Sequence, residues 1–510
     1  MVLGIELGST RIKGVLTDKS GKILAVGEYG WENKLIDGLW TYSLESVWTG
    51  IRSCYSALNV AYKEKTGAYI TELDAIGISA MMHGYLVFDK DDNLLVPFRT
   101  WRNTNTGIAA AELTEALDFN MPQRWSATHF YQAVLNKEPH VKDAAFLTTL
   151  SVYVHYKLTG RKVIGIGDAS GMFPIKDGEY DKTRIGIYDK LVSKRGVSCD
   201  LKKMLPEIAL AGENAGELTE DGARLLDESG NLKSGAVFCA PEGDAGTGMV
   251  ATNSVRERTG NVSAGTSAFA MIVLDKPLKK VHTAIDMITT PCGKHVAMIH
   301  ANNCTSEINA WVNLFSDAIK LFGAEVKTGE LYEKLFKISA ESDETVGKIY
   351  ADNFLAGEPI VGVKKGRPMV FRNAGGTMNV ANFMQAQIYA AVAPLNIGMK
   401  ILKEENVAID GIYGHGGYFK TERIGQAAMS AALDVPVTVM KTAGEGGAYG
   451  IALLALYSLI RKDGETLADF LDAFFKDEEK STVSATEAEK RRFANFMETY
   501  ESGLKVARGF

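Results

Sequence analysis

Acidic, basic and hydroxyl side chains stand beside glycine near the start of the chain. Glu6, Gly8, Thr10 and Lys13 follow one another within eight residues, so a carboxylate, a Gly-Ser-Thr turn and a lysine lie close in sequence. Backbone N–H groups and hydroxyls in such a turn can hold a phosphate, and the carboxylate can face the accompanying cation. An ordinary hairpin with a solvated lysine has the same pattern, so this segment alone does not decide between them.

Asp244 is a candidate general base. It follows Gly243, directly after an expected apolar strand at residues 236–239. Glycine lets a substrate approach the backbone, and an acid at a strand end can accept a hydroxyl proton. An aspartate that only caps a helix or makes a turn is a common alternative.

Further glycine-rich segments are suited to a nucleotide. Gly265 and Thr266 repeat the glycine-plus-hydroxyl arrangement after an expected strand. Residues 414–417 (Gly-His-Gly-Gly) and 444–447 (Gly-Glu-Gly-Gly) each lie between an expected strand and an expected helix. Bare backbone at a helix start leaves room for a flat ring or a pyrophosphate, although ordinary α/β turns look similar.

A third kind of segment is suited to a polyol. Met82 and His83 lie on one expected loop, and Trp101, Arg102 and Asn103 lie after the next strand pair. Tryptophan offers an apolar face to C–H groups, while histidine, arginine and asparagine can hydrogen-bond hydroxyls. For His83, a partly buried histidine with satisfied partners is the ordinary alternative.

Mixed α/β domains must position these segments. Short apolar runs broken by glycine and serine predict strands, and longer runs predict helices. The expected strands are 3–7, 12–17, 23–29, 75–79, 85–88, 259–263, 269–274 and 436–440, and the expected helices are 45–65, 385–405, 421–433 and 448–461. Residues 109–158 are expected to be mainly helical, and the charged tail 462–510 is expected to form one docked surface helix or a pair of them. Because a strand–turn–strand unit occurs twice, we expect two related domains, 1–245 and 246–510, facing a shared cleft.

Composition argues against several functional classes. The 510 residues carry a net charge of -6 without a basic tract, so neither nucleic acid nor an anionic membrane is an expected partner. Five scattered cysteines and an N-terminus without a leader pattern favour a reduced, cytoplasmic protein. No GxxxxGK[ST] segment occurs, and no histidine has metal-ligand spacing. Residues 165–171 (Gly-Ile-Gly-Asp-Ala-Ser-Gly) lack the final spacing of a dinucleotide fingerprint.

In order along the chain, these segments resemble motifs of the FGGY family of carbohydrate kinases. Residues 6–13 look like its first phosphate motif, although Glu6 replaces the usual aspartate. Residues 79–84 (Ser-Ala-Met-Met-His-Gly) are similar to the Ser-Gly-Gln-Met-His-Gly segment of xylulokinases, and residues 156–160 with 168–171 to a Lys-Leu-Thr-Gly…Asp-Ala-Ser-Gly stretch. Gly243-Asp244, Gly265-Thr266 and residues 414–417 match the catalytic, second phosphate and adenosine motifs.

The resemblance implies two actin/Hsp70-like (ribonuclease H-like) ATPase domains, with sugar bound mainly by the first and ATP by the second. It implies Mg-ATP-dependent phosphorylation of a ketopentose, with D-xylulose as the first choice. The implied roles are Asp244 as base; Glu6 and Asp244 for Mg²⁺; Gly8, Thr10, Lys13, Gly265 and Thr266 for phosphates; Gly414, Gly416 and Gly417 for adenosine; and Met82, His83, Trp101, Arg102 and Asp244 for the sugar.

Other readings stay open from the sequence. The substrate could be ribulose, a deoxy-hexulose or glycerol, because Met81 and Arg102-Asn103 depart from the xylulokinase pattern. A non-catalytic sugar sensor or an actin-like ATPase switch is a rival of a different class, against which the intact acid at Asp244 speaks. Whether the chain forms a homodimer also stays open.

Overall fold

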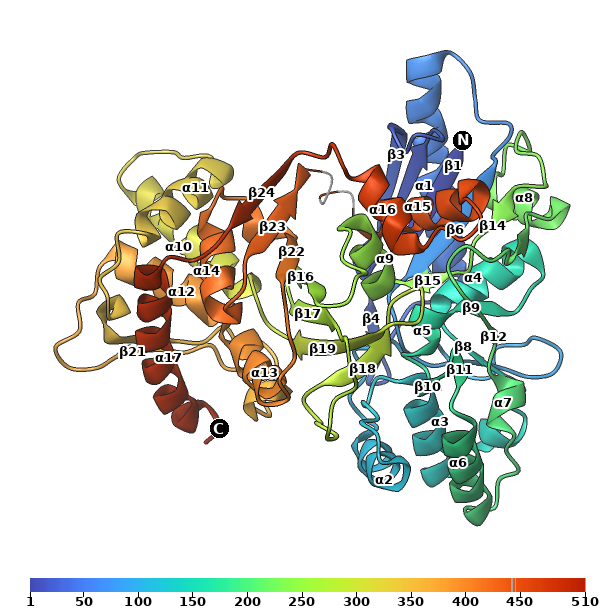
Figure 1. Cartoon of the computed structure of the whole chain (residues 1–510), viewed down its shortest axis with the longest axis horizontal. Helices are drawn as coiled ribbons and strands as arrows, with labels where there is room; N and C mark the ends of the chain where they lie inside the picture. Colours follow the sequence, from blue (N-terminus) through green and yellow to red (C-terminus); the bar gives the residue numbers. More distant parts are fainter. Residues whose placement is uncertain (442–443, 445, 510) are drawn as a thin grey trace. The chain divides into compact units, whose positions relative to one another are not determined.

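The computed structural model describes residues 1–441, 444 and 446–509, which form two compact α/β units (Figure 1). Unit 1 comprises Met1–Val255, Lys280–Val296 and Glu445–Lys476, and unit 2 comprises Arg256–Lys279, Ala297–Gly444 and Asp477–Phe510. The α/β class is as expected. Each unit is assembled from three separate segments of the chain, whereas the sequence led us to expect a single boundary near residue 245. Glu445 of the second double-glycine segment and the last residue, Phe510, lie outside the described residues.

A twisted mixed sheet forms the centre of unit 1. Its order is β13-β14-β6-β1-β2-β3, and β15 also pairs with β6. The bounds are β1 Val2–Leu7, β2 Arg11–Thr17, β3 Ile23–Gly30, β6 Ala75–Ala80, β13 Gly216–Glu217, β14 Val237–Phe238 and β15 Glu242–Gly243. The first three strands form the expected antiparallel meander, whereas β1, β14 and β15 all run parallel to β6.

Helices pack against this sheet at very short distances. Helix α1 (Leu44–Thr66) packs on β2 and β3, and α15 (Gly446–Ile460) packs on β1, β6 and α9 (Asp244–Ala251). A Cβ at Gly4 of β1 would lie 2.1 Å from the carbonyl oxygen of Ala448 in α15. Only glycine allows this close approach. Residues 446–460, although they come late in the chain, therefore pack within unit 1.

The rest of unit 1 is largely helical. The segment expected to be mainly helical contains α2 Gly107–Leu117, α3 Ser126–Leu135, η1 Pro139–Lys142 and α4 Leu150–Thr159. It also contains the unexpected strand β8 (Phe146–Thr148), which pairs with β7 (Leu86–Phe88). The remaining elements are β4 Lys34–Ile36, β5 Leu39–Thr41, β9 Val163–Gly165, α5 Ile166–Ala169, β10 Ile175–Lys176, β11 Glu179–Tyr180, α6 Lys182–Lys194, α7 Leu201–Met204, β12 Glu207–Ala209, α8 Glu220–Leu226, β18 Asp286–Thr289 and α16 Leu467–Phe474.

Unit 2 contains a second sheet built on a similar plan. It includes β19 His295–Ala301, β17 Ala268–Val273, β16 Thr259–Ala264, β22 Gly411–His415, β23 Val437–Met440 and β24 Lys480–Val483, in that order. As in unit 1, a hairpin (β16–β17) is followed by a parallel neighbour, because β22 runs parallel to β16. This similarity agrees with the expected internal repeat of shape.

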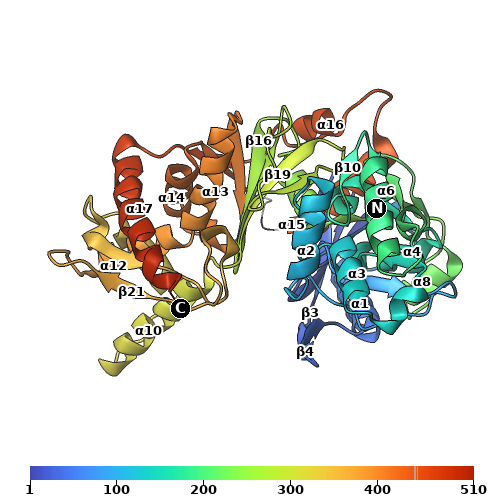
Figure 2. The same ribbon diagram turned by 90° about the horizontal axis from the view of Figure 1, so that it is seen from below.

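Helices of unit 2 depart from expectation in one place. The helix expected at 385–405 is two helices, α12 (Val380–Ala390) and α13 (Ala393–Glu404), because Pro394 occupies the first turn of α13 and cannot continue a preceding helix. Helix α17 (Glu487–Ala507) begins with a capping box at Thr486 and packs on α12 and α14 (Figure 2). The other helices and strands of unit 2 are α10 Ser306–Leu321, α11 Thr328–Ser339, η2 Val346–Lys348, β20 Ile349–Ala351, η3 Pro359–Val361, β21 Val370–Arg372, η4 Gly417–Phe419 and α14 Ile424–Leu433.

None of the helices in the described part of the chain combines the length and the apolar character that crossing a membrane requires.

Candidate active site

The carboxyl ends of three parallel strands meet at one edge of the unit 1 sheet. Glu6 of β1 and Glu242 of β15 both pair in register with Ser79 of β6. The residues that directly follow these strands therefore lie together, which brings Met82 and Asp244 to the same edge as Glu6. Such edges are the usual ligand sites of parallel α/β sheets.

Asp244 is held at this edge through one oxygen. It is the first residue of α9, and its Oδ1 accepts the backbone N–H groups of Met82 (3.2 Å) and Ala245 (3.0 Å). Among the described residues, none donates to Oδ2. Burial raises the pKa of this carboxyl to about 6, because the charged form loses hydration. The geometry leaves a fixed carboxylate with one oxygen able to accept a proton from an added hydroxyl.

Glu6 lies against the start of α15. Its Oε2 accepts the Ala448 N–H at 3.1 Å, and a Cβ at Gly447 would lie 2.4 Å from Oε1. Burial and then the nearby Asp244 charge raise its pKa to about 7, while backbone bonds and Lys13 oppose the shift. The space beside Gly447, which the sequence suggested for a nucleotide, is thus occupied in unit 1 by the Glu6 carboxylate.

This pair of acids fits a cation with few protein ligands. A positive ion near Glu6 and Asp244 would relieve the unfavourable proximity of their charges. In residues 1–441, 444 and 446–509, no group of three or more metal-ligating side chains gathers. Mg²⁺ usually keeps several waters and takes one or two carboxylates plus substrate phosphates, so two acids are sufficient.

Aromatic side chains hold the glycine–hydroxyl turn after β1. Trp31 Nε1 donates to the Gly8 carbonyl oxygen (2.7 Å), and Tyr42 donates to the Ser9 carbonyl oxygen (2.5 Å). Trp101 Nε1 donates to Ser9 Oγ (3.2 Å), so the tryptophan expected beside the sugar is also tied to this turn. Thr10 is exposed beside it, and Lys13 pairs in register with Glu6.

Met82 and His83 lie next to Asp244, in the segment that follows β6. His83 is buried, adopts φ +67°, and has Nδ1 3.0 Å from the Gly171 carbonyl oxygen. A Cβ at Gly243 would lie 2.1 Å from Met82 Cγ, so the methionine packs on the backbone beside the catalytic candidate. The ordinary alternative for His83, a buried ring with a partner, therefore holds for its Nδ1 atom.

Arg102 and its neighbour Asn103 are less directly connected to this edge. The exposed Arg102 guanidinium stacks over the Trp40 ring, with its carbon 3.8 Å from the ring centroid. Asn103 is buried and accepts the Trp40 N–H at 2.9 Å while donating to the Trp40 carbonyl oxygen at 2.9 Å. Asn103 thus fixes the loop, and Arg102 extends from its surface.

In unit 2, the two remaining nucleotide motifs lie side by side. Because β16 and β22 are parallel, Ser263 pairs with His415, and both strands end at the same edge. Gly416 adopts φ +106°, and a Cβ there would lie 2.4 Å from the Ala264 carbonyl oxygen. Cβ atoms at Gly265 and Gly417 would instead meet open space among the described atoms. Bare backbone from both motifs is therefore accessible, while Gly414 is needed for packing against the Phe419 ring (2.7 Å).

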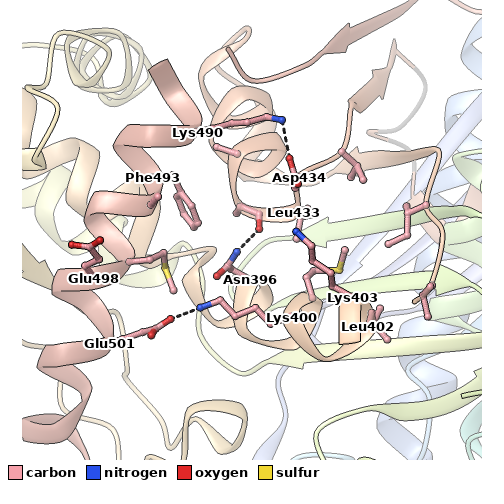
Figure 3. A pocket seen from close by; sticks show the side chains of 18 of the residues that line it. Asn396, Lys400, Leu402, Lys403, Leu433, Asp434, Lys490, Phe493, Glu498 and Glu501 are labelled. Atoms are coloured by element: carbon pink, nitrogen blue, oxygen red, sulfur yellow. Dashed lines mark hydrogen bonds and ion pairs between the residues drawn. The ribbon is translucent and has the colours of Figure 1, made fainter. Parts of the chain in front are cut away.

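A separate pocket in unit 2 has a volume of about 860 Å³ and lies among α13, α14 and α17 (Figure 3). Ion pairs join Lys400 to Glu501 and Lys490 to Asp434 (2.8 Å) at its walls. None of the residues expected to bind sugar, nucleotide or metal lines it. We therefore assign it no part in the chemistry at the strand ends.

Sequence reasoning missed the support behind Asp244. Glu242 is 2% exposed, and Asp168 is 1% exposed and accepts the hydroxyls of Thr149 (2.7 Å) and Ser151 (2.5 Å). Ser79 and Thr247 hydroxyls also meet at 2.9 Å beneath the site. The glycine pattern of residues 165–171 was the available signal, but periodicity could not show that it accommodates a carboxylate.

Comparison with known proteins identifies the family to which the chain belongs. The model of the N-terminal domain of the FGGY family of carbohydrate kinases matches residues 1–231, and that of the C-terminal domain matches residues 260–459. A xylulose kinase of Haemophilus influenzae is 21% identical over 519 residues, covering 99% of each chain. A glycerol kinase of Thermococcus gammatolerans is 24% identical over 397 residues, covering 72% of this chain and 73% of its own.

Solved structures share the fold along nearly the full length. A ligand-bound xylulose kinase from Lactobacillus acidophilus has a TM-score of 0.79 at 17% identity, covering 99% of both chains. A gluconate kinase from the same organism has a TM-score of 0.79 at 17% identity, covering 99% of this chain and 98% of its own. The two domain models together span most of the sequence, and the segment that contains Glu242 and Asp244 lies between the two matched ranges. The chain therefore belongs to the FGGY family of carbohydrate kinases and is an ATP-dependent sugar kinase of two α/β domains with the actin/Hsp70-like ATPase fold.

Proposed function

We propose that this kinase phosphorylates a hydroxyl of a ketopentose, converting D-xylulose to D-xylulose 5-phosphate. The observation that carries the catalytic part is the Asp244 carboxylate, fixed through Oδ1 at the sheet edge with Oδ2 open to an added donor. The sugar choice is supported by the xylulose kinase of Haemophilus influenzae, which matches over 99% of the chain, and by the Met82-His83 pair beside Asp244.

In the proposed reaction, Asp244 Oδ2 accepts the proton of the attacking sugar hydroxyl. The sugar oxygen then bonds to the γ-phosphorus as the bond to the β,γ-bridging oxygen breaks, and ADP leaves. Phosphoryl transfer has a loose transition state, so positioning and charge neutralisation supply most of the rate enhancement. The carboxylate therefore acts mainly by orienting the hydroxyl and taking its proton as the new bond forms.

The other strand-end residues would bind the two substrates. We assign the phosphates to Gly8, Thr10, Lys13, Gly265 and Thr266, adenosine to Gly414, Gly416 and Gly417, and the sugar to Met82, His83, Trp101 and Arg102. Gly414 would act indirectly, because its own contact is with Phe419. Glu6 and Asp244 would hold Mg²⁺, which, when bound, neutralises charge on the transferred group.

A smaller polyol such as glycerol is the second candidate. It is favoured by the glycerol kinases of Thermococcus species among the relatives. It is also favoured by Met81 and Arg102-Asn103, which depart from the xylulokinase pattern. Neither change touches Asp244, so the same phosphoryl-transfer step would apply to a different alcohol.

A coupled ADP-release assay tests both candidates. It compares D-xylulose, D-ribulose, a deoxy-hexulose, gluconate and glycerol at equal concentration, with a no-sugar control for ATP hydrolysis. We expect the largest kcat/KM with D-xylulose and little ADP without sugar. A larger kcat/KM with glycerol would replace the substrate proposal. ADP release that no alcohol stimulates would contradict kinase action on all of these sugars.

A further inference from the structure

The Glu242 carboxylate lies directly behind the proposed base. It is buried and accepts the backbone N–H groups of Gly167 (3.0 Å), Asp168 (2.9 Å) and Gly243 (3.3 Å). These bonds join β15, which leads into Asp244, to the first residues of α5. Because a buried carboxylate without partners is very costly, the three N–H groups stabilise one arrangement of these two segments.

Glycines leave the space that this carboxylate occupies. A Cβ at Gly165 would lie 2.3 Å from Glu242 Oε1, and one at Gly167 would lie 2.5 Å from Oε2. At Gly246, in the first turn of α9, a Cβ would lie 3.2 Å from Pro291 Cγ and 3.3 Å from Glu242 Oε2. The glycine pattern that resembles part of a dinucleotide fingerprint is therefore explained by a side chain of the same protein.

The α5 segment continues from Glu242 to the expected sugar side. The carbonyl oxygen of Gly171, just after α5, accepts from His83 Nδ1 at 3.0 Å, and a Cβ at Gly171 would lie 2.8 Å from Met82 Cε. Met82 in turn donates its N–H to Asp244 at 3.2 Å. The contacts thus form a closed path from Glu242 through α5 and His83 back to Asp244.

Asp168 strengthens the middle of this path. Its Oδ2 accepts the hydroxyls of Thr149 (2.7 Å) and Ser151 (2.5 Å) at the start of α4. A Cβ at Gly243 would lie 3.3 Å from its Oδ1. The backbone next to Asp244 is consequently confined by Glu242 on one side and by Asp168 on the other.

We propose that Glu242 is a positioning residue that holds the backbone of Asp244 and the His83 loop at the separation needed for proton transfer. This inference rests on the proposed role of Asp244. Glu242 is only 2% exposed and does not touch substrate; it acts through Gly243 and α5. Misplacing a reacting group by about 1 Å can cost about 100-fold in rate, so a small shift is enough to matter.

The test is a comparison of Glu242→Gln with Asp227→Asn. Asp227 is a matched control in the same unit: it is 5% exposed and accepts backbone N–H groups of Ser229 (3.0 Å), Asn231 (3.0 Å) and Leu232 (2.9 Å), but contacts no proposed site residue. In both variants an amide replaces a buried carboxylate and turns an N–H group toward backbone donors. Both variants thus perturb backbone hydrogen bonds, and the thermal midpoint of each is measured so that kcat is compared between folded proteins.

For Glu242→Gln we expect kcat to fall about 10- to 100-fold, with the KM for ATP and the dissociation constant for ADP changed less than about twofold. Asp227→Asn should keep kcat within about twofold. Gly246→Ala is a milder second variant, because its methyl group would press on the Glu242 carboxylate and on the Pro291 ring without altering Glu242 itself. It should lower kcat about threefold or more while the protein stays folded.

Two results would overturn the positioning role. One is near-normal kcat in both Glu242→Gln and Gly246→Ala; the other is an equal loss of kcat in Asp227→Asn at equal thermal stability. If Glu242→Gln does not fold, Gly246→Ala decides alone. Asp244→Asn separates this failure from that of the proposed function: an active Asp244→Asn contradicts the base, whereas an inactive one beside active Glu242 variants contradicts only the positioning.

Discussion

The two glycine–hydroxyl hairpins of this kinase share a backbone plan but differ in what surrounds them. In unit 1, Gly8 N–H donates to the Arg11 carbonyl oxygen at 2.9 Å; in unit 2, Gly265 N–H donates to the Ser267 carbonyl oxygen at 2.9 Å. Each hairpin follows a strand with a parallel neighbour. The next-to-last residue of that strand is Glu6 in the first unit and Ser263 in the second, so only the first hairpin begins with a carboxylate.

The hairpins are also held in different ways. The first is bonded by the side chains of Trp31, Tyr42 and Trp101. The second is bonded by the start of α10, where Cys304 and Thr305 N–H groups donate to the carbonyl oxygens of Thr266 (2.9 Å) and Gly265 (2.9 Å). The unit 1 hairpin thus combines a carboxylate with hydrogen bonds from aromatic side chains, whereas the unit 2 hairpin presents bare backbone at Gly265. We therefore expect charge-dependent chemistry in unit 1 and nucleotide binding in unit 2.

Asp244→Asn should give the largest effect and is the most direct way to break this comparison. Loss of a general base typically costs 10²–10⁴-fold, so we expect kcat to fall about 1,000-fold while ADP binding, measured by calorimetry, is kept. Because burial raises the Asp244 pKa, the charged form destabilises the fold above that acid's unfolded pKa. The free energy of unfolding at pH 8 should therefore rise by about 1–2 kcal/mol. Near-full activity of Asp244→Asn would show that this carboxylate is not the base of the reaction.

Glu6→Gln tests whether the carboxylate that distinguishes the first hairpin serves the cation. We expect roughly 100-fold lower kcat/KM at limiting Mg²⁺, because removing one negative ligand weakens electrostatic stabilisation of the bound ion. Titrating Mg²⁺ at fixed ATP should show a higher half-saturating concentration. The matched change Ser263→Ala in unit 2 should leave that concentration unaltered, and an unchanged Mg²⁺ dependence in Glu6→Gln would contradict the assignment.

The pH dependence should sharpen the same contrast. A base works only when deprotonated, and burial raises the Asp244 pKa to about 6. Activity should therefore rise about tenfold per pH unit up to about pH 6 and then level off. The measurement is log(kcat/KM) against pH between 4.5 and 8 at a low, fixed Mg²⁺ concentration, because a cation bound to Asp244 would lower its pKa. A flat profile through this range would be inconsistent with Asp244 as the base.

His83→Ala tests the assignment of the sugar to unit 1. Losing one hydrogen-bonding side chain beside Asp244 should raise the KM for sugar about 5- to 10-fold, corresponding to about 1 kcal/mol or slightly more. The KM for ATP should change much less. Steady-state kinetics with each substrate varied in turn distinguish the two constants, and equal increases in both would count against a sugar-specific role.

Gly265→Ala should have the smallest effect on the fold and a selective one on nucleotide. A Cβ there would meet no described atom within 4 Å, so thermal stability should stay unchanged. If phosphate occupies that space, the added methyl group should weaken ADP binding about fivefold, close to 1 kcal/mol. The KM for sugar should be unaffected. Unchanged ADP affinity in the folded variant would break the proposed link between this bare backbone and nucleotide.

Local pattern predicted much of the fold. The meander of β1 to β3, helix α1, strands β16 and β17 and helix α14 lie close to their expected positions, because period and turn residues act over a few neighbours. Strand β8 was missed because its few apolar residues lie within a helical pattern, and the split at Pro394 because the apolar period continues across it. Membership of the FGGY family also followed from motifs in order along the chain.

By itself, the sequence determined the α/β class, the kinase family and which residue types were available for phosphate, sugar and proton transfer. Only the tertiary structure decided that Gly447 makes room for Glu6, that Trp101 bonds to Ser9, and that Gly165 and Gly167 make room for Glu242. The physical reason is sequence separation: Ala448 lies 442 residues from Glu6, and Glu242 lies 75 residues from Gly167. Such contacts arise from strand pairing and helix packing, which no local pattern of residues contains.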